Sequence, residues 1–381
     1  MHVEDFMKTF DELNFLCLAL PSCKAAENFM AFVFSLILSP STSISGMAEL
    51  FEGEICQSTL NRFLTSCKIS TARLLAMYRK WVVNQARNCR IVYCIIDDSL
   101  LHKSGKNLPG ANYAYDHSRG AVCWGQNVVI CLAKLGEINL LFGIELYDKT
   151  ARKFLSKIDW AKRLTRQFAG YFTGKAVIYL FDSWYCCQKL IDALPAGAQW
   201  VSKLKRNRII FVGGQRFSLR DFVRSVNSWQ YHRVSVDGKV YWCHEIIVEV
   251  NKLGTLKIVL TKGSKYARKV SAVLVSNMLD ATAEELVRHF TQRWEIEVCI
   301  RTEKQSLGFE GCMVRNKKAL RRYWMLLMVS YSLLSKLKEN VFHKAKTHGD
   351  VIKGLKKRFS RLREGIFSLI KIHVRGIFAK G

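Results

Sequence analysis

Three acidic residues stand where their side chains could carry chemistry together. Asp98 and Asp182 each follow an apolar, strand-like stretch, and Glu297 lies in a long segment without Pro or Gly. Carboxylate oxygens are the hard ligands that Mg²⁺ and Mn²⁺ prefer, and clustered carboxylates repel one another unless cations separate them. Two such ions about 3.5–4 Å apart can activate an attacking oxygen and stabilise a leaving one in phosphoryl transfer. Taken singly, an acid after a strand is more often a turn former or a helix cap.

The segment around Glu297 is predicted to be one long helix. Thr282 and Glu285 form a capping-box pattern and Gly308 is a stop signal. Between them, about 24 residues without Pro or Gly would make a helix roughly 36 Å long.

One side of this helix carries a carboxylate between two cations. At about 100° per residue, the four residues Phe290, Arg293, Glu297 and Lys304 fall within an arc of roughly 60°. The simplest interpretation is a surface stripe, whose Arg293–Glu297 pair would stabilise the helix by only about 0.2–0.5 kcal/mol. A chemical role depends on the rest of the chain.

The chain is strongly basic. Its 381 residues hold 59 Lys and Arg against 31 Asp and Glu, a formal net charge of +28. Such self-repulsion indicates a polyanionic partner. Nucleic acid is favoured over a membrane, because the longest apolar run, Phe29–Leu38, is about half of a bilayer span. The sequence has no nucleotide-binding glycine pattern and no signal-peptide region, so we expect no nucleotide cofactor and a cytoplasmic, nucleoid-associated protein.

The cysteines do not predict a metal site. The 13 residues are scattered without CxxC pairs, and neither Cys186-Cys187 nor Cys243-His244 has zinc spacing. We expect buried, reduced thiols.

The first 88 residues are predicted to be mostly helical. Helical apolar spacing covers three stretches, Asp11–Leu20, Ala25–Leu38 and Thr71–Gln85. Between them, Ser45–Leu50 and Gln57–Leu64 are compatible with a DNA-reading helix-turn-helix. The first 60 residues hold eight acidic and two basic side chains, which disfavours phosphate binding, so packing or dimerisation is the preferred role.

The next part of the chain is predicted to form a mixed sheet. Strand-like and helical stretches follow one another in the order Ile91–Ile96, Val122–Ala133, Ile138–Tyr147, helix Arg152–Ala169, Ala176–Phe181, helix Tyr185–Leu194 and Gln199–Lys203. This order suits an antiparallel meander extended by parallel strands through right-handed crossovers. Function in such sheets collects at the carboxyl ends of strands, where Asp98 and Asp182 are expected.

Five segments are therefore expected. They are a helical N-terminal domain at 1–88, the first part of an α/β core at 89–203, an inserted antiparallel β unit at 204–270, the second part of the core at 271–335, and a basic C-terminal tail at 336–381. The last segment holds 13 Lys or Arg against three acids, which is typical of a solvated tail that follows a nucleic-acid backbone.

These residues resemble a known family, the DDE transposases of bacterial insertion sequences. One branch carries a Tyr, Arg, Glu and Lys signature with two, three and six intervening residues, and Phe290, Arg293, Glu297 and Lys304 keep these spacings. The segment from Asp98-Ser99 to Lys106 is similar to the first-aspartate segment, and Asp182 is similar to the second aspartate. The resemblance spans about residues 90–335. It implies a ribonuclease-H-like fold, with a mixed five-stranded sheet flanked by helices and an inserted β unit.

Two positions depart from the pattern. Phe290 stands where the signature has Tyr, and so lacks a hydroxyl that could bond a phosphate oxygen, which is worth about 0.5–1.5 kcal/mol. Asp97 and Asp98 are adjacent, and strand neighbours point to opposite faces, so only one can meet a metal. The family places its acid directly before Ser or Thr, which favours Asp98, with Asp97 as the alternative.

The resemblance implies a metal-dependent enzyme that cuts DNA at the ends of a mobile element and joins them to a target. Asp98, Asp182 and Glu297 would hold two Mg²⁺ or Mn²⁺ ions. Water would attack first and the freed 3′ hydroxyl next. Terminal repeats and target DNA would be the partners, bound by a homodimer.

Several other residues are candidate DNA contacts. Arg293 and Lys304 are expected to hold phosphates beside the scissile bond. The remaining candidates are rings and cations near the acids or in the β insertion, namely Phe290, Lys103, Lys106, Lys205, Arg206, Trp229 and Trp242. Either tryptophan could stack on an unpaired base, although core packing is the commoner role. Two alternative functions fit the same sequence: a DNA-binding relic or repressor without cleavage, and a nuclease that does not join strands.

Overall fold

The computed structural model describes residue 11 and residues 14–116, 118–359 and 366–380. Parts of the predicted N-terminal domain and basic tail (1–10, 12–13, 360–365 and 381), including positions 12–13 of the helix predicted at Asp11–Leu20, lie outside the described residues.

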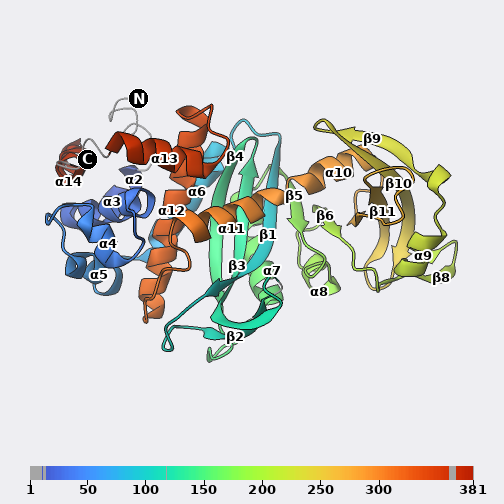
Figure 1. Ribbon diagram of the computed structural model, residues 1–381, viewed down its shortest axis with the longest axis horizontal. Helices are drawn as coiled ribbons and strands as arrows, with labels where there is room; N and C mark the ends of the chain where they lie inside the picture. Colours follow the sequence, from blue (N-terminus) through green and yellow to red (C-terminus); the bar gives the residue numbers. More distant parts are fainter. Residues whose placement is uncertain (1–10, 12–13, 117, 360–365, 381) are drawn as a thin grey trace.

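A mixed sheet runs through the middle of the molecule (Figure 1). Its first strands are β1 (Ile91–His102), β2 (Ala111–Asp116), β3 (Ala121–Leu135), β4 (Ile138–Tyr147), β5 (Ala176–Phe181) and β6 (Gln199–Lys203). β1 pairs antiparallel with β3 and parallel with β5, and β5 pairs parallel with β6. Apolar runs such as Ile91–Ile96 suit strands covered on both faces. β2, which sequence periodicity did not reveal, pairs with β3.

The inserted β segment continues this sheet. It contains β7 (Ile209–Val212), β8 (Gln215–Ser218), α9 (Leu219–Ser225), the 3₁₀ turn Ser228–Gln230, β9 (His232–Val236), β10 (Lys239–Val250) and β11 (Gly254–Lys262), and β12 (Ala272–Ser276) follows just beyond the predicted limit at residue 270. β12 pairs antiparallel with both β11 and β6. The described residues therefore form one sheet of 12 strands, because β12 bridges two parts that sequence patterns indicated as separate.

The helix predicted over residues 280–308 is two helices. α10 (Ala283–Thr291) begins at the predicted Thr282–Glu285 capping box, and α11 (Trp294–Ser306) ends just before Gly308. Between them the backbone makes i→i−3 hydrogen bonds, from Arg293 N–H to the Phe290 carbonyl (3.0 Å) and from Ile296 N–H to the Arg293 carbonyl (3.2 Å). This tightening is of the 3₁₀ type. Together α10 and α11 cross one face of the sheet (Figure 1).

Helices from the two ends of the chain pack on one another. The N-terminal group is α2 (Asn14–Leu18), α3 (Cys23–Leu38), α4 (Ile44–Glu49), α5 (Gln57–Thr65) and α6 (Thr71–Gln85). The C-terminal group is α12 (Lys317–Asn340), α13 (His348–Phe359) and α14 (Ile366–Lys380). α3 is buried along most of its length and contacts α12, α13 and α14.

The prediction of a solvated basic tail was wrong for the described residues. α12 runs past position 336, and α13 buries Val351, Ile352, Leu355 and Phe359 at helical spacing. The apolar stripe anchors this segment, and Lys356 adds a hydrogen bond to the Ser39 carbonyl after α3 (3.0 Å), while Lys353 and Lys357 are exposed. None of the described helices is long and apolar enough to cross a membrane.

α7 (Lys157–Tyr171) and α8 (Gln188–Ile191) are the crossover helices before and after β5. A capping box at Ser156 and Asp159 starts α7. The first residue of this helix, Lys157, therefore lies at a fixed place relative to β1.

Candidate active site

The two adjacent aspartates of β1 face different surroundings. On the face shared by Tyr93 and Asp97, Tyr93 hydrogen-bonds His289 of α10 (2.9 Å) and the Asp97 carboxylate lies 3.1 Å from the guanidinium of Arg293. Asp98 points to the other face, because successive strand residues alternate. There its Oδ2 lies 2.5 Å from Nζ of Lys157 at the start of α7.

Asp182 follows β5 directly beside Asp97. The last register pair of these parallel strands is Ile96 with Phe181, so the next residue on each strand is an aspartate. Residues paired across neighbouring strands share a face of the sheet, which puts Asp182 on the side of Asp97 rather than Asp98. The Trp184 N–H donates to Oδ1 of Asp182 (2.8 Å) and holds its carboxylate in place.

Arg293 connects the strand to the helix that carries Glu297. Its Nη1 donates to Asp97 and its Nη2 donates to Glu297, one turn further along α11. The guanidinium is buried, with 8% of the residue exposed. Its Nε has no hydrogen-bond partner within the described part of the chain. The tightened turn between α10 and α11 is what brings this arginine inward.

Burial raises the pKa of Asp97 from 3.8 to about 7. The nearby Arg293 acts in the opposite direction, whereas the negative charges of Asp98 and Asp182 raise the pKa further. A single guanidinium therefore does not compensate the acids around Asp97.

Asp98 has a complete set of protein partners. Besides Lys157, it accepts a hydrogen bond from the Tyr185 hydroxyl (3.0 Å). Tyr185 is buried, and burial together with the charge of Asp98 raises the pKa of its hydroxyl. These contacts hold the loop after β5 against β1.

Phe290 lies between two cations. Nζ of Lys203, at the end of β6, is 5.5 Å from the ring centroid, and the guanidinium carbon of Arg293 is 5.7 Å from it. The ring is half-buried. It therefore positions both cations at the edge of the acidic group.

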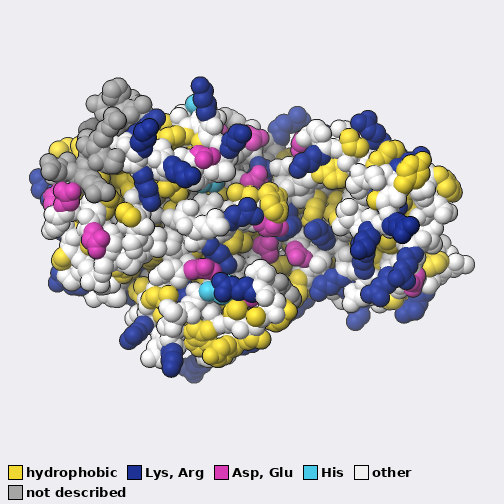
Figure 2. Space-filling model, viewed as in Figure 1, with side chains coloured by type: hydrophobic (Ala, Val, Ile, Leu, Met, Phe, Trp, Pro, Cys, Tyr) yellow, Lys and Arg dark blue, Asp and Glu magenta, His cyan; other side chains and the backbone are white. Residues whose placement is uncertain are grey.

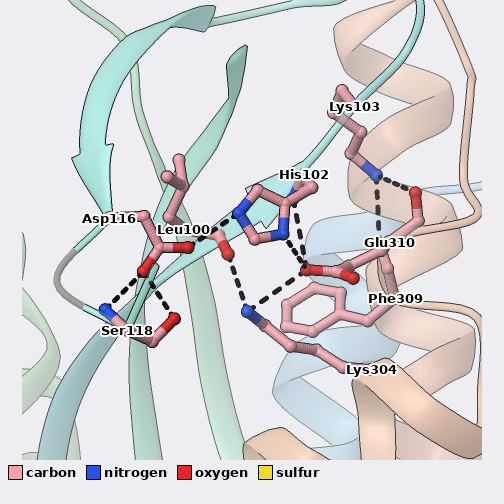
Figure 3. Close-up of polar contacts among 8 residues, drawn as sticks. All are labelled: Leu100, His102, Lys103, Asp116, Ser118, Lys304, Phe309 and Glu310. Atoms are coloured by element: carbon pink, nitrogen blue, oxygen red, sulfur yellow. Dashed lines mark hydrogen bonds and ion pairs between the residues drawn. The ribbon is translucent and has the colours of Figure 1, made fainter. Parts of the chain in front are cut away.

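Lys304 is held at the far end of α11 (Figure 3). Its ammonium donates to the Leu100 carbonyl of β1 (2.7 Å) and lies 3.2 Å from the Glu310 carboxylate. It remains about a quarter exposed, with 24% of the side chain accessible. One donor is thus committed to β1, and a phosphate would compete with Glu310 for the others.

The structure does not place Lys103 on a DNA-facing surface. Its ammonium donates to the carbonyls of Phe309 (3.1 Å), Glu310 (2.8 Å) and Cys312 (3.0 Å), as Figure 3 shows for the first two. Burial lowers the pKa of Lys103 to about 8. All three ammonium donors are used, so this lysine fixes the loop after α11 instead of meeting phosphate.

The other candidate DNA contacts are accessible to different degrees. Lys106, Lys205 and Arg206 are exposed, although Arg206 also donates to the Val270 carbonyl (2.5 Å). Trp229 is 74% exposed, whereas Trp242 is half-buried under Lys265. On the face of the molecule drawn in Figure 2, acidic side chains gather near the middle and many Lys and Arg side chains lie over the inserted β segment.

Sequence patterns did not single out Lys157, Tyr185 or Lys203 as site residues. Each comes from a different element, at the start of α7, after β5 and at the end of β6. Only the folded sheet brings them together, and no fixed spacing marks them. Lys157 directly follows the helix cap Ser156, which is the one local signal for its position.

Comparisons with known proteins identify the family of this chain. A protein-family model described as a transposase DDE domain matches residues 95–333, a span that begins on β1 and ends within α12. It includes all four acids described above. A search of the curated proteins found no match. Because the family match covers more than half of the chain, this chain belongs to the transposase DDE domain family.

Proposed function

We propose that this chain is a transposase of a bacterial insertion sequence, which cuts the ends of its mobile element and joins them to target DNA. The observation that carries the proposal is the arrangement of three acids from distant parts of the chain. Asp97 and Asp182 are neighbours in register, and Arg293 connects Asp97 to Glu297. We therefore propose Asp97, Asp182 and Glu297 as the metal-binding acids, with Asp97 in place of the Asp98 that sequence reasoning favoured.

The donor set fits divalent ions. All three groups offer carboxylate oxygens, which suit Mg²⁺ or Mn²⁺. Burial and neighbouring acids raise the pKa of Asp97, so the deprotonated group lacks positive charge that bound ions would supply. When bound, two such ions activate an attacking oxygen and stabilise the leaving oxygen of the DNA strand.

Arg293 is proposed to have two successive roles. Without DNA, its two outer nitrogens hold Asp97 and Glu297 at fixed positions. Were cations bound to these carboxylates, the guanidinium of Arg293 would be released to donate to a phosphate beside the scissile bond. Lys304 is proposed to take a second phosphate, in exchange for Glu310.

Asp98 is proposed to be a positioning residue. Its contacts with Lys157 and Tyr185 tie α7 and the loop after β5 to the strand that carries Asp97. Because Trp184 N–H in the same loop holds Asp182, this loop determines where the second acid lies.

The DNA path is proposed to cross the inserted β segment. Lys106, Lys205 and Arg206 offer exposed charge for backbone phosphates, and the exposed Trp229 offers a ring for an unpaired base. Joining two ends requires both to be held at once, which supports at least a dimer on DNA. A DNA substrate would place the protein at the bacterial nucleoid.

Two observations favour an inactive, DNA-binding protein as the second candidate. Arg293 already compensates part of the charge of Asp97 and Glu297 without metal, and Phe290 replaces the signature Tyr. A strand-transfer assay with labelled element ends, target plasmid and Mg²⁺ distinguishes the functions. A transposase gives nicked ends and joined product. Binding without nicking would indicate the relic, and nicking without joining would indicate a nuclease.

A further inference from the structure

A second group of possible metal ligands lies beyond the acids, where β1, β2 and β3 meet. One ligand atom each from His102, Asp116 and Cys123 lies within 4.8 Å of the others. His102 ends β1, Asp116 ends β2 and Cys123 lies near the start of β3.

Strand register puts these three side chains on one face. His102 pairs with Gly125 of β3, and Asp116 pairs with Ala121 of the same strand. Cys123 lies midway between these two partners, and alternate residues of a strand share a face. Gly125 lets β3 approach β1 closely here, because a Cβ at this position would collide with the Leu101 carbonyl oxygen. The three ligands are therefore brought together by the sheet itself.

Neighbouring groups orient two of the three ligands (Figure 3). Nε2 of His102 lies 2.7 Å from Oδ2 of Asp116, while its Nδ1 faces the Glu310 carboxylate at 3.4 Å. The other oxygen of Asp116 accepts from the backbone N–H (2.8 Å) and hydroxyl (2.6 Å) of Ser118. Metal-binding histidines usually present their second nitrogen to a carboxylate or carbonyl, and metal-binding carboxylates are hydrogen-bonded in turn.

We propose that His102, Asp116 and Cys123 bind one Zn²⁺ ion, with water as the fourth ligand. An imidazole, a carboxylate and a thiolate form a mixed set that suits tetrahedral zinc and is too soft for Mg²⁺. With zinc–ligand bonds of about 2.0–2.3 Å, the ligand atoms would lie roughly 3.3–3.7 Å apart. The present arrangement needs only small side-chain movements to reach that geometry.

The zinc ion would join the β2–β3 hairpin to the end of β1. Glu310, which faces His102, also contacts Lys304 at 3.2 Å. The site is thus connected to the end of α11, although the proposal does not rest on the proposed DNA chemistry. The expectation of no zinc site relied on sequence-local spacing, whereas these ligands come from three strands.

Cobalt binding tests the proposal directly. Metal-free full-length protein is titrated with Co²⁺ in excess Mg²⁺, which occupies oxygen-only sites, and thiolate-to-cobalt absorption is recorded in the near ultraviolet. One Co²⁺ per chain should give this band, and Zn²⁺ should displace it. Cys123→Ser should abolish the band, whereas Cys56→Ser should retain it, because Cys56 is an exposed thiol elsewhere, before α5.

Two further variants separate a metal site from a hydrogen-bonded pair. Glu310→Gln should weaken Zn²⁺ binding about 10–100-fold, as expected for a group that orients a ligand. Asp116→Asn should weaken Zn²⁺ binding more than Glu310→Gln does. It serves as the second ligand variant if circular dichroism shows that Cys123→Ser is not folded. Three results would overturn the proposal. The thiolate-to-cobalt band could be absent from the wild type, it could persist in folded Cys123→Ser, or it could be lost equally in Cys56→Ser.

Discussion

Replacing Asp97 by Asn should abolish DNA cleavage and yet stabilise the metal-free protein. The pKa of this carboxyl is raised from 3.8 to about 7, an effect that already includes the opposing contact with Arg293. The folded state therefore binds this proton more tightly than the unfolded state does. The stability that this proton contributes to the folded state is fully present below pH 4 and is lost as pH rises through 7.

The magnitude follows from the size of the shift. Roughly three pKa units at 1.36 kcal/mol each correspond to a loss on the order of 4 kcal/mol above pH 8. Asn keeps the shape without the charge. Asp97→Asn should therefore unfold with a higher free energy than wild type at pH 8 in EDTA, and the difference should vanish near pH 4. Urea unfolding across this pH range measures it.

The same substitution, Asp97→Asn, should lower the rate of DNA cleavage although it raises the stability of the metal-free protein. Loss of a metal-binding acid removes several kcal/mol of transition-state stabilisation, so nicking of a labelled element end should fall at least about 1,000-fold. Asp98→Asn is the matched control: it loses the Lys157 ion pair but can still accept from Tyr185, and should retain activity within about tenfold. Full cleavage by Asp97→Asn, or abolished cleavage by a folded Asp98→Asn alone, would refute the assignment.

Three other predictions follow from single side chains. Phe290→Tyr should raise the cleavage rate about 2–10-fold, because the added hydroxyl can bond a phosphate oxygen; an unchanged single-turnover rate would argue against that contact. Trp229→Ala should weaken binding to DNA with an unpaired end about 5–150-fold, because stacking on an aromatic ring is worth about 1–3 kcal/mol per base. Binding to fully paired duplex should be unchanged, and fluorescence anisotropy measures both. Burial lowers the pKa of His348 to about 4, so wild type should lose about 3 kcal/mol of stability as pH falls from 6.5 to 4, whereas His348→Gln should show a flatter pH profile in urea unfolding.

Sequence periodicity located most of the sheet but not all of its limits. β4 and β5 begin and end at the predicted residues, because turns and apolar runs mark them clearly. β1 continues six residues beyond Ile96, since Asp97 and Asp98 are paired with β3 in spite of their charge. Pairing across the sheet overrides the local tendency of aspartate to form turns.

The helix of Glu297 shows what periodicity cannot predict. Its capping box and its glycine stop are present, but the interruption at Arg293 has no Pro or Gly to mark it. The contact that accompanies it, from Arg293 to Asp97, joins residues 196 positions apart. Tertiary contacts of this kind determine local geometry without leaving a signal in the neighbouring sequence.

The proposal of Asp97 over Asp98 as a metal-binding acid rests on the register of two strands. The sequence shows that adjacent acids must face opposite ways, but not which face α11 covers. The pairing of Ile96 with Phe181 and the position of Arg293 provide that information. Lys103 illustrates the same limit, because a cation in a basic loop gave no indication that three carbonyls would bury it.

The most direct test of the proposed chemistry is the position of Mn²⁺ in crystals of the protein bound to DNA. Anomalous scattering should show ions in contact with Asp97, Asp182 and Glu297, and no ion on Asp98 beside Lys157. Ions bound through Asp98, or an ordered protein–DNA complex with Arg293 still joining Asp97 to Glu297 and no Mn²⁺ on the acids, would contradict the account.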